Sequence, residues 1–321
     1  MGRKQRGRPV SGILVVNKPA GMTSNDTLQK AKYLFYAAKA GHTGSLDPLA
    51  TGVLPICFGE ATKFTQFLLD ADKCYLSTFR FGATTTTADA EGEVLERHSA
   101  AALTEQQVVG AIEGFVGDIM QVPPMYSALK VDGVPLYKLA RQGVEVERNA
   151  RPVTIYSYRL LAFRPGEEAE ADVEIRCSKG TYIRTLAEDL GAAVGCGAHV
   201  SKLHRSEAGC FSDQDSITLA ELETLRENCL GEDLDYLLKP VDASVAHLMA
   251  VDLPESVAWY FRRGQPVTAP KAYREAQEGD IVRIFESGGQ FLGVGEVLED
   301  GRLAPKRLVV EPQGASPAAQ A

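Results

Sequence analysis

The sequence predicts an α+β protein in which a large mixed domain is followed by a small β-barrel domain. Up to about residue 249, short apolar or alternating segments typical of strands are interspersed with segments of helical periodicity. From about residue 250 the composition changes to short strands separated by Gly and Pro turns, and that spacing favours a small barrel. A chain of 321 residues is long enough to bury a large core and to form this second domain.

The first half of the chain predicts three strands and three helices. The basic segment 1–9 is expected to be disordered. Apolar runs and period-two alternation predict strands over 12–16, 52–58 and 73–82. Apolar positions at helical spacing predict helices over 24–38, 60–70 and 104–116. Ser24 is the expected N-cap of the first helix, and Thr104 with Gln107 is the expected capping box of the third.

The second half continues this alternation before the composition changes. Strands are predicted over 151–163, 171–177 and 197–205, and a helix over 183–191 is expected to end at Gly191. The acidic stretch 213–242 is expected to form a surface helix and a connector. Barrel strands are expected near 264–267, 279–284, 291–296 and 303–307, followed by a disordered tail over 313–321. Gly293 and Gly295 do not indicate a cofactor loop, because no helix follows and a third glycine is missing.

The composition argues against a membrane protein and against a disulfide-bonded one. No stretch approaches the ~18 uninterrupted apolar residues of a spanning helix, and the N-terminus lacks the apolar run of a signal peptide. The six cysteines are widely spaced and form no Cys-x-x-Cys pair, which indicates free thiols in a reducing compartment. We therefore expect a cytoplasmic protein. A zinc site at Cys196, His199, His204 and Cys210 is an alternative whose spacing matches no standard finger.

The charge distribution leaves a nucleic-acid partner open. The formal net charge is −8, yet residues 1–39 contain eight basic residues and one acidic residue. Residues 213–242 contain nine acidic and two basic residues. A basic surface can therefore coexist with an acidic total, and phosphate binding depends on the surface rather than on the total.

Residues 41–63 form the stretch around which the candidate chemistry is organised. Four glycines and two prolines exclude a long helix here and favour a sharply turned loop that carries a single carboxylate, Asp47. His42 lies just upstream, and a short apolar strand follows the loop. Rigid elements position loop residues well for chemistry, although an isolated Asp-Pro pair more often only begins a turn.

Other candidate residues also have ordinary structural interpretations. Lys18 and Pro19 end the first strand, and Tyr75 lies on a strand where most aromatics are core residues. Arg184 lies near the start of the helix over 183–191, where a lone arginine is usually a surface charge. Residues 121–151 combine a hairpin signal, Asp132-Gly133, with basic residues interleaved with tyrosines. That composition suits either a solvated loop or an RNA-binding insertion.

Three strings in order resemble the tRNA pseudouridine synthase B (TruB) family. They are the Lys18-Pro19-x-Gly21-x-Thr23-Ser24 string, the stretch 41–63 around Asp47, and the string from Gly180 to Arg184. The resemblance covers about residues 12–312. It implies a catalytic domain over 10–249 with a mixed, mainly antiparallel sheet of the pseudouridine synthase type. It also implies a PUA RNA-binding domain over 250–312, and isomerisation of uridine to pseudouridine at position 55, in the T loop of tRNA.

The resemblance also implies a role for each candidate residue. Asp47 is the nucleophile, which attacks C6 of the base or C1′ of the sugar, and Arg184 pairs with it. Tyr75 stacks on the base and is a candidate to help remove the C5 proton. His42 fills the space left by the flipped base, which must leave the folded T loop to react. Tyr182, Leu203 and Lys18 complete the substrate-binding set, with Lys18 and Pro19 also supporting the catalytic loop.

The reaction is redox-neutral, and we expect neither a cofactor nor a metal. The expected partner is tRNA, gripped at its T arm by the insertion over 121–151 and elsewhere by the PUA domain; a monomer is expected. Two other functions stay open. One is a catalytically silent RNA-binding or RNA-folding protein, which would not need Asp47, Tyr75 and Arg184 together. The other is a pseudouridine synthase that acts on ribosomal or guide-directed RNA.

Overall fold

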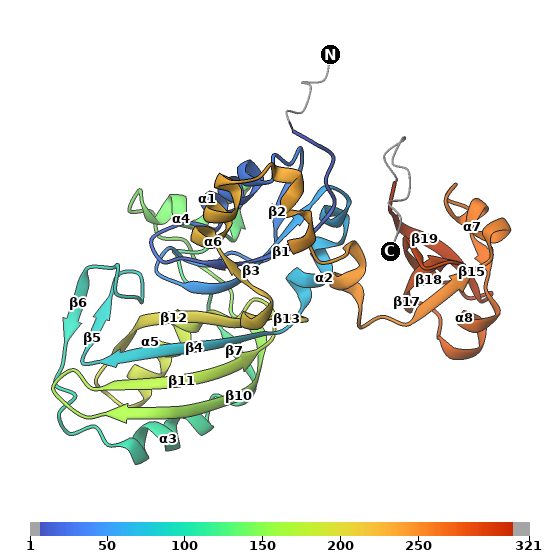
Figure 1. Cartoon of the computed structure of the whole chain (residues 1–321). Helices are drawn as coiled ribbons and strands as arrows, with labels where there is room; N and C mark the ends of the chain where they lie inside the picture. The colour runs from blue at the N-terminus through green and yellow to red at the C-terminus, as the bar shows by residue number, and fades with distance from the viewer. Residues whose placement is uncertain (1–6, 311–321) are drawn as a thin grey trace.

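The computed structural model describes residues 7–310, apart from the side chain of Tyr273. The expected disorder of 1–6 and of the 313–321 tail lies outside these residues. The described chain forms a large domain built on one long sheet and a smaller C-terminal domain that lies beside it (Figure 1). Within residues 7–310, no helix is long and apolar enough to cross a membrane.

The large domain is built on a ten-stranded sheet with the order β14-β1-β3-β12-β4-β11-β10-β7, in which β2 also pairs with β3 and β13 with β12. Only the β1–β14 and β3–β12 pairs of this sheet are parallel. The predicted α+β class with a mixed, mainly antiparallel sheet is therefore confirmed. The strands are β1 (Gly12–Lys18), β2 (Ala40–His42), β3 (Thr51–Phe58), β4 (Lys73–Phe81), β7 (Gly117–Gln121), β10 (Arg151–Arg164), β11 (Glu170–Cys177), β12 (Ala198–Ala208), β13 (Phe211–Ser212) and β14 (Ile217–Thr218).

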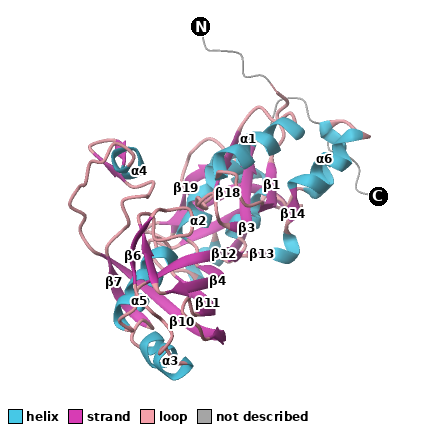
Figure 2. Ribbon diagram, turned by 90° about the vertical axis from the view of Figure 1, so that its left-hand side faces the viewer, coloured by secondary structure: helices cyan, strands magenta, loops and turns pink. Residues whose placement is uncertain are grey.

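The large domain contains six helices within the described residues, of which α4 lies on the insertion away from this sheet (Figure 2). They are α1 (Ser24–Leu34), α2 (Thr65–Asp70), α3 (Glu105–Glu113), α4 (Leu136–Ala140), α5 (Ile183–Ala193) and α6 (Leu219–Glu227), with short 3-10 turns at η1 (Gly59–Phe64), η2 (Asp213–Asp215), η3 (Gly231–Leu237) and η4 (Val241–Val245). Helix α5 packs on β12 and helix α3 packs on β10, and their apolar residues share one core with those of β4 and β11. Phe79 and Phe81, on the face predicted from the alternation of β4, are fully buried in this core.

Two helix boundaries differ from the sequence predictions for physical reasons. The N-cap of α1 is Thr23, which forms a capping box with Asp26, whereas the Ser24 hydroxyl is used elsewhere. Helix α5 continues past Gly191 to Ala193. A Cβ at Gly191 would lie 2.1 Å from the Ala198 nitrogen, so this glycine allows β12 to approach the helix rather than ending it. The predicted capping box of Thr104 and Gln107 is present at α3.

Two other segments also differ. The helix predicted over 60–70 is a 3-10 turn, η1, followed by the short helix α2. In the acidic stretch 213–242, α6 is preceded by β14, which the sequence analysis did not predict and which pairs with β1. Two small antiparallel pairs complete the large domain: β5 (Ala83–Thr85) with β6 (Val94–Arg97), and β8 (Lys130–Val131) with β9 (Val134–Pro135).

The start of the described chain is ordered by ion pairs with the acidic stretch. Arg8 donates to Asp235, to the Gly231 carbonyl and to the Phe35 carbonyl, so the expected disorder of 7–9 is wrong. Lys30 pairs with Glu223 in the same way. The basic N-terminal segment and the acidic stretch therefore neutralise each other in part, and the surplus of positive charge at 1–39 is not all available to phosphate.

The C-terminal domain is a curled five-stranded sheet with the order β15-β17-β18-β19-β16. It forms a half-barrel around Phe261, Ile284 and Leu303, in agreement with the small β-barrel that the strand spacing predicts. Its elements are β15 (Ala250–Leu253), α7 (Glu255–Phe261), β16 (Val267–Thr268), α8 (Pro270–Glu275), β17 (Ile281–Glu286), β18 (Gln290–Val297) and β19 (Arg302–Leu308).

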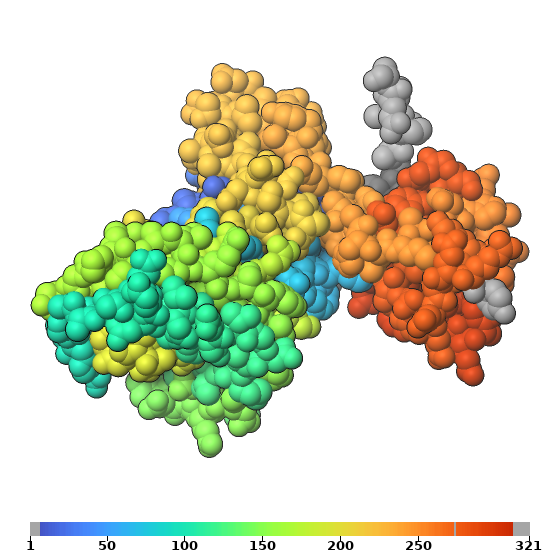
Figure 3. Space-filling model, turned by 90° about the horizontal axis from the view of Figure 1, so that it is seen from below, coloured from blue at the N-terminus to red at the C-terminus, as the bar shows by residue number. Residues whose placement is uncertain are grey.

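The C-terminal domain is docked on the large domain through an apolar cluster. Phe64 of η1 packs on Phe291 of β18 with ring centroids 5.4 Å apart, and Val245 and Val294 are buried beside them. Lys63 donates to the Leu308 carbonyl at 2.9 Å. Figure 3 shows the two domains in contact on one side of the molecule. Removal of residues from 250 onward would therefore expose a core surface of the large domain.

Candidate active site

The loop between β2 and β3 forms the wall of a cleft of about 750 Å³. This cleft brings together six of the seven residues predicted for the site, from four separate stretches of chain. They are His42, Asp47, Tyr75, Tyr182, Arg184 and Leu203. Lys18 is the exception. Its side chain is fully buried, and its amino group donates to the carbonyls of Pro19, Met22 and Pro48. Lys18 therefore supports the loop rather than contacting a substrate, and burial lowers its pKa to about 8.

Two further residues, Ser24 and Arg205, fix the loop that carries Asp47. The Ser24 hydroxyl accepts from the Leu46 N–H at 2.7 Å and donates to the Leu46 carbonyl at 3.1 Å. From the other side, Arg205 of β12 donates to the carbonyls of Gly44 and Val53. Gly52, whose φ is +106°, lets the Arg205 backbone approach, since a Cβ there would lie 2.3 Å from the Arg205 carbonyl oxygen. The loop is thus held on both sides of Asp47.

Asp47 and Arg184 form a two-point ion pair in this cleft. Arg184 Nε lies 2.9 Å from Asp47 Oδ2, and its Nη2 donates to Asp47 Oδ1 at 3.2 Å. Such a planar, bidentate contact fixes the direction of a carboxylate as well as its charge. Arg184 lies in the first turn of α5 and is buried, so the interpretation of it as a surface charge is wrong.

Arg184 is itself held by three groups that the sequence analysis did not identify. It donates to the Thr87 carbonyl at 3.0 Å and to the Tyr126 carbonyl at 2.8 Å, and its Nε lies 3.9 Å from the buried Asp89. Asp89 lies in a polar loop whose composition resembles that of any surface loop. The only sequence feature that could have pointed to Asp89 is its place in a polar loop, since loops held on a rigid sheet often carry functional groups.

The pKa of Asp47 is raised from its ordinary value because burial penalises the charged carboxylate, while the charge of Arg184 opposes that rise. Asp89 adds to the rise, and Lys18 counters it. The carboxylate depends on Arg184 to stay charged in a site that is otherwise unfavourable to it.

Tyr75 and Leu203 lie on adjacent strands of the cleft floor. In the β4–β12 register Tyr75 is opposite Arg205, and Ser77 is opposite Leu203. Burial raises the pKa of Tyr75, and the neighbouring Arg205 guanidinium acts in the opposite direction. Leu203 and Arg205 are two residues apart on one strand, so the period of a strand could have placed Arg205 in the site beside Leu203.

His42 and Tyr182 line the walls of the cleft. His42 ends β2, and its Nδ1 is buried without a hydrogen-bond partner among the described residues. Burial, together with the charge of Arg205, lowers the pKa of His42, which favours a neutral ring suited to stacking. The backbone of Tyr182 is clamped by the Gln121 side chain, which both accepts from its N–H and donates to its carbonyl.

The insertion over 121–151 projects from the body of the large domain beyond β7 (Figure 2). The predicted Asp132-Gly133 hairpin is present, with positive φ at both residues, and it joins β8 to β9. Tyr126, Tyr137 and Arg141 of the insertion line the cleft. The insertion therefore lies over the residues that hold Asp47.

The cysteine and histidine residues considered for zinc have separate partners. His199 Nδ1 contacts the Ala83 carbonyl, His204 bridges Thr51 and Asp213, and the Cys210 thiol contacts the Ala243 carbonyl. No group of three or more His, Cys, Asp or Glu residues within residues 7–310 is arranged to hold a metal ion. All six cysteines are free thiols.

Family models match most of the chain. The model described as "TruB family pseudouridylate synthase (N terminal domain)" matches residues 32–183. The "tRNA pseudouridylate synthase B C-terminal domain" model matches 184–246, and the "Pseudouridine synthase II TruB, C-terminal" model matches 250–309.

Curated relatives and solved structures agree with these models. The tRNA pseudouridine synthase B of Saccharophagus degradans is 60% identical over 307 residues, 96% of this chain and 98% of the relative. That of Pseudomonas aeruginosa is 54% identical over 94% of this chain and 97% of the relative. The structure titled "Crystal Structure of a Cbf5-Nop10-Gar1 Complex" contains a chain with 25% identity and a TM-score of 0.68, covering 94% of this chain and 84% of that one. The chain belongs to the TruB family of pseudouridylate synthases.

Proposed function

We propose that this protein isomerises uridine to pseudouridine in tRNA, at position 55 in the T loop. The observation that carries the proposal is the two-point pair of the buried Arg184 with Asp47, on a loop fixed over a cleft that also contains Tyr75. The relatives that are 54–60% identical over almost their whole length are named for tRNA pseudouridine synthesis. The free thiols fit a reducing compartment, and we expect the reaction to occur in the cytoplasm.

In the proposed mechanism Asp47 is the nucleophile, and attack at C6 of the base or at C1′ of the sugar leads to the same product. The bond between N1 and C1′ breaks, the uracil turns, and a bond forms between C5 and C1′. The proton at C5 is lost, and N1 gains one, so the reaction is an isomerisation. Arg184 keeps the Asp47 carboxylate charged and oriented. Asp47 needs no activating base, because a carboxylate ionises readily.

The uridine must leave the folded T loop to reach Asp47, at a cost of a few kcal/mol. His42, in the wall of the cleft, is placed to fill the vacated stack. Tyr75 is placed to stack on the flipped uracil, with Tyr182 and Leu203 as further walls. Lys18 stabilises the loop through its hydrogen bond to the Pro48 carbonyl and does not contact the base.

The insertion is proposed to grip the T arm. Lys130, Lys138 and Arg141 are exposed, and none of them forms an ion pair with another described residue. Arg141 lies 5.5 Å from the centre of the Tyr137 ring, a cationic and aromatic pair suited to phosphates and bases. The contact between Tyr126 and Arg184 links this grip directly to the catalytic carboxylate.

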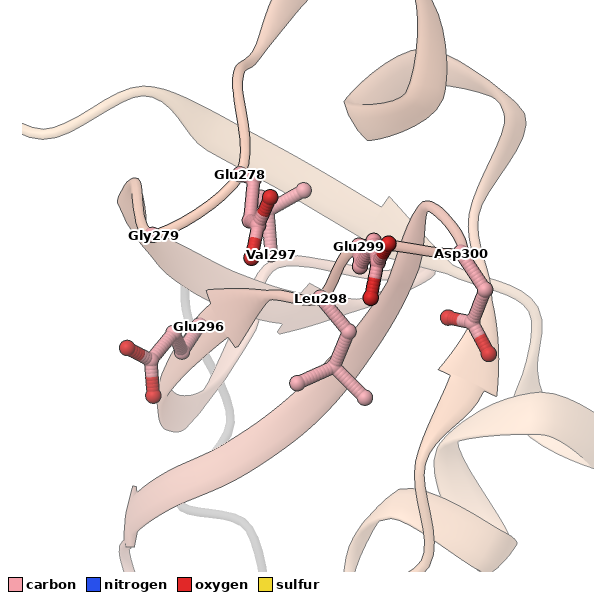
Figure 4. A pocket seen from close by; sticks show the side chains of 7 residues that line it. All are labelled: Glu278, Gly279, Glu296, Val297, Leu298, Glu299 and Asp300. Atoms are coloured by element: carbon pink, nitrogen blue, oxygen red, sulfur yellow. The ribbon is translucent and has the colours of Figure 1, made fainter.

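The C-terminal domain, proposed as a PUA domain, has two surfaces of different character, and only one of them suits RNA. A hollow lined by Glu278, Glu296, Glu299 and Asp300 is acidic and unsuited to phosphate (Figure 4). On α7, the half-exposed Trp259 carries the Arg263 guanidinium 3.3 Å from its ring centre, with Tyr260 beside it. We propose that this aromatic and basic surface of α7 contacts RNA.

Replacement of Trp259 and Arg263 by Ala is expected to weaken tRNA binding about fivefold or more, because a stacked base contributes roughly 1–3 kcal/mol. The slope of log K against log[salt] should become shallower by about one unit for the lost cation. An isolated T-arm hairpin should be modified at the normal rate. Point variants are preferable to truncation at 250, which would expose Phe64. Replacement of Tyr236, exposed on the large domain, by Ala is the control. Unchanged affinity and slope in the double variant would exclude this surface.

Tyr75 can be tested for stacking and for proton transfer separately. Tyr75→Phe is expected to bind tRNA normally but to lose about 10²–10⁴-fold in rate, the usual contribution of a proton-transfer group. Tyr75→Leu should also lose binding of the flipped base. Single-turnover product formation and tRNA affinity are the measurements. Full activity of Tyr75→Phe would leave only the ring in the mechanism, and full activity of both variants would remove Tyr75 from the site.

The proposed substrate is tested by mapping pseudouridine in RNA treated with the purified protein. Unmodified tRNA and ribosomal RNA transcripts are supplied together, and every uridine is read. We expect one new pseudouridine, at position 55 of tRNA. Modification of ribosomal RNA alone would favour the alternative substrate, whereas binding of tRNA without any new pseudouridine would favour the RNA-folding alternative.

A further inference from the structure

Arg205 is the one buried arginine of the described chain that has no carboxylate partner. Only Arg184 and Arg205 are buried among the arginines of residues 7–310, and Arg184 is paired with Asp47. Arg205 is 1% exposed and forms no ion pair with any described residue. An unpaired cation in a protein interior is costly. That cost suggests that the charge of Arg205 serves the site rather than the fold.

The guanidinium of Arg205 contacts the catalytic loop on one side. Its Nε donates to the Val53 carbonyl at 2.8 Å, and its Nη2 donates to the Gly44 carbonyl at 3.1 Å, three residues before Asp47. A guanidinium has five N–H donors in a fixed plane. These two bonds therefore orient the group and leave donors free to point elsewhere.

Tyr75 lies on the other side of Arg205. The two residues are directly opposite in the antiparallel β4–β12 register, so their side chains leave the sheet on the same face. Both line the cleft. The positive charge of Arg205 favours the ionised form of the Tyr75 oxygen against the effect of burial.

The charge of Arg205 also acts on its basic neighbours. It helps to lower the pKa of Lys18, Lys73 and His42, in each of which burial is the larger cause. A guanidinium remains charged in proteins. Arg205 therefore supplies a positive charge beside Tyr75 that is not lost on titration, and Arg184 supplies such a charge beside Asp47.

We propose that Arg205 is a positioning residue that holds the Tyr75 hydroxyl at a fixed position relative to the loop that carries Asp47. Its guanidinium binds the loop at Gly44 and the strand that follows the loop at Val53, and its charge acts on the phenol oxygen. A shift of the loop alone, or of Tyr75 alone, would change this relative position. The inference rests on the proposed role of the Tyr75 hydroxyl, and its test is designed to fail separately from that role.

The test is a double-mutant cycle between Arg205 and the Tyr75 hydroxyl. Arg205→Gln removes the charge but keeps an amide that can donate to a carbonyl. In the native background it should lower the single-turnover rate about 10–100-fold, and Arg205→Lys should be less impaired than Arg205→Gln. In the Tyr75→Phe background either substitution should lower the single-turnover rate less than about threefold, because the oxygen on which Arg205 acts is already absent.

Arg226 supplies the matched control. It also donates to two backbone carbonyls, those of Leu34 and Cys229, but lies outside the cleft. Arg226→Gln should leave the rate unchanged in both backgrounds. Thermal unfolding of every variant shows whether the fold is retained.

Several results would overturn the proposal. Equal losses from Arg205→Gln in the two backgrounds would mean that Arg205 only supports the loop. Failure of both Arg205 variants to fold, while Arg226→Gln folds, would assign Arg205 to the fold itself. A fully active Tyr75→Phe would remove the hydroxyl, and with it the target of Arg205. An inactive native protein on tRNA would refute the proposed function instead, before the cycle is measured.

Discussion

Asp47→Asn is expected to lower pseudouridine formation by more than about 10³-fold, since the proposed nucleophile is lost while the shape of the side chain is kept. The loop should stay in place, because Lys18, Ser24 and Arg205 hold it through backbone groups and not through the Asp47 carboxylate. tRNA affinity should therefore change little. The measurement is single-turnover product formation with saturating enzyme, alongside the dissociation constant for tRNA.

Asp89→Asn is the informative comparison for this variant. Asp89 lies 3.9 Å from Arg184 but is not on the loop of Asp47. Its replacement should be less severe than that of Asp47, because it affects the aim of Arg184 and not the nucleophile. Activity of Asp47→Asn within about tenfold of the native rate would mean that Asp47 is not the nucleophile.

Arg184→Lys is expected to lose about 10²-fold in rate although the charge is conserved. The native guanidinium contacts both oxygens of Asp47 and also donates to the carbonyls of Thr87 and Tyr126. A lysine ammonium is a point charge without a planar fork, so it cannot make these contacts at once. A displacement of about 1 Å at a reacting group is enough for a loss of this size.

The pair of Arg80 and Glu170 provides the control for this substitution. These residues form an ion pair on the surface of the same sheet, with the Arg80 side chain 41% exposed. Arg80→Lys should be neutral for activity and nearly neutral for stability, because exposed pairs contribute little. Near-native activity of Arg184→Lys would reduce Arg184 to a general electrostatic role.

The sequence predicted the fold class and most elements, because their signals are local. The alternation of β4 and the capping box at Thr104 depend on residues close together in the chain. The errors have long-range causes. Helix α5 passes through Gly191 because β12 packs against that glycine, and β14 forms because β1 offers it an edge.

The sequence analysis predicted the site residues that belong to a recognisable motif. It missed the residues that only the tertiary structure brings into the site. Asp47 and Arg184 were named from strings that resemble the family, and Tyr75 from the role that the resemblance implies for it; the fold brings all three to one cleft. Asp89 and Arg205 belong to none of those strings. Their contacts join residues 95 and more positions apart in the sequence. The strand period could have placed Arg205 on the same face as Leu203, but no local pattern reports the partners of either residue.

The most direct test of the central claim is tritium release from tRNA labelled at C5 of its uridines. Isomerisation at one uridine must release one tritium per tRNA, since C5 loses its hydrogen when it bonds to C1′. With the native protein we predict one equivalent from a transcript with uridine at position 55, and none when that nucleotide is cytidine. Equal release from both transcripts, or none from either, would contradict the account.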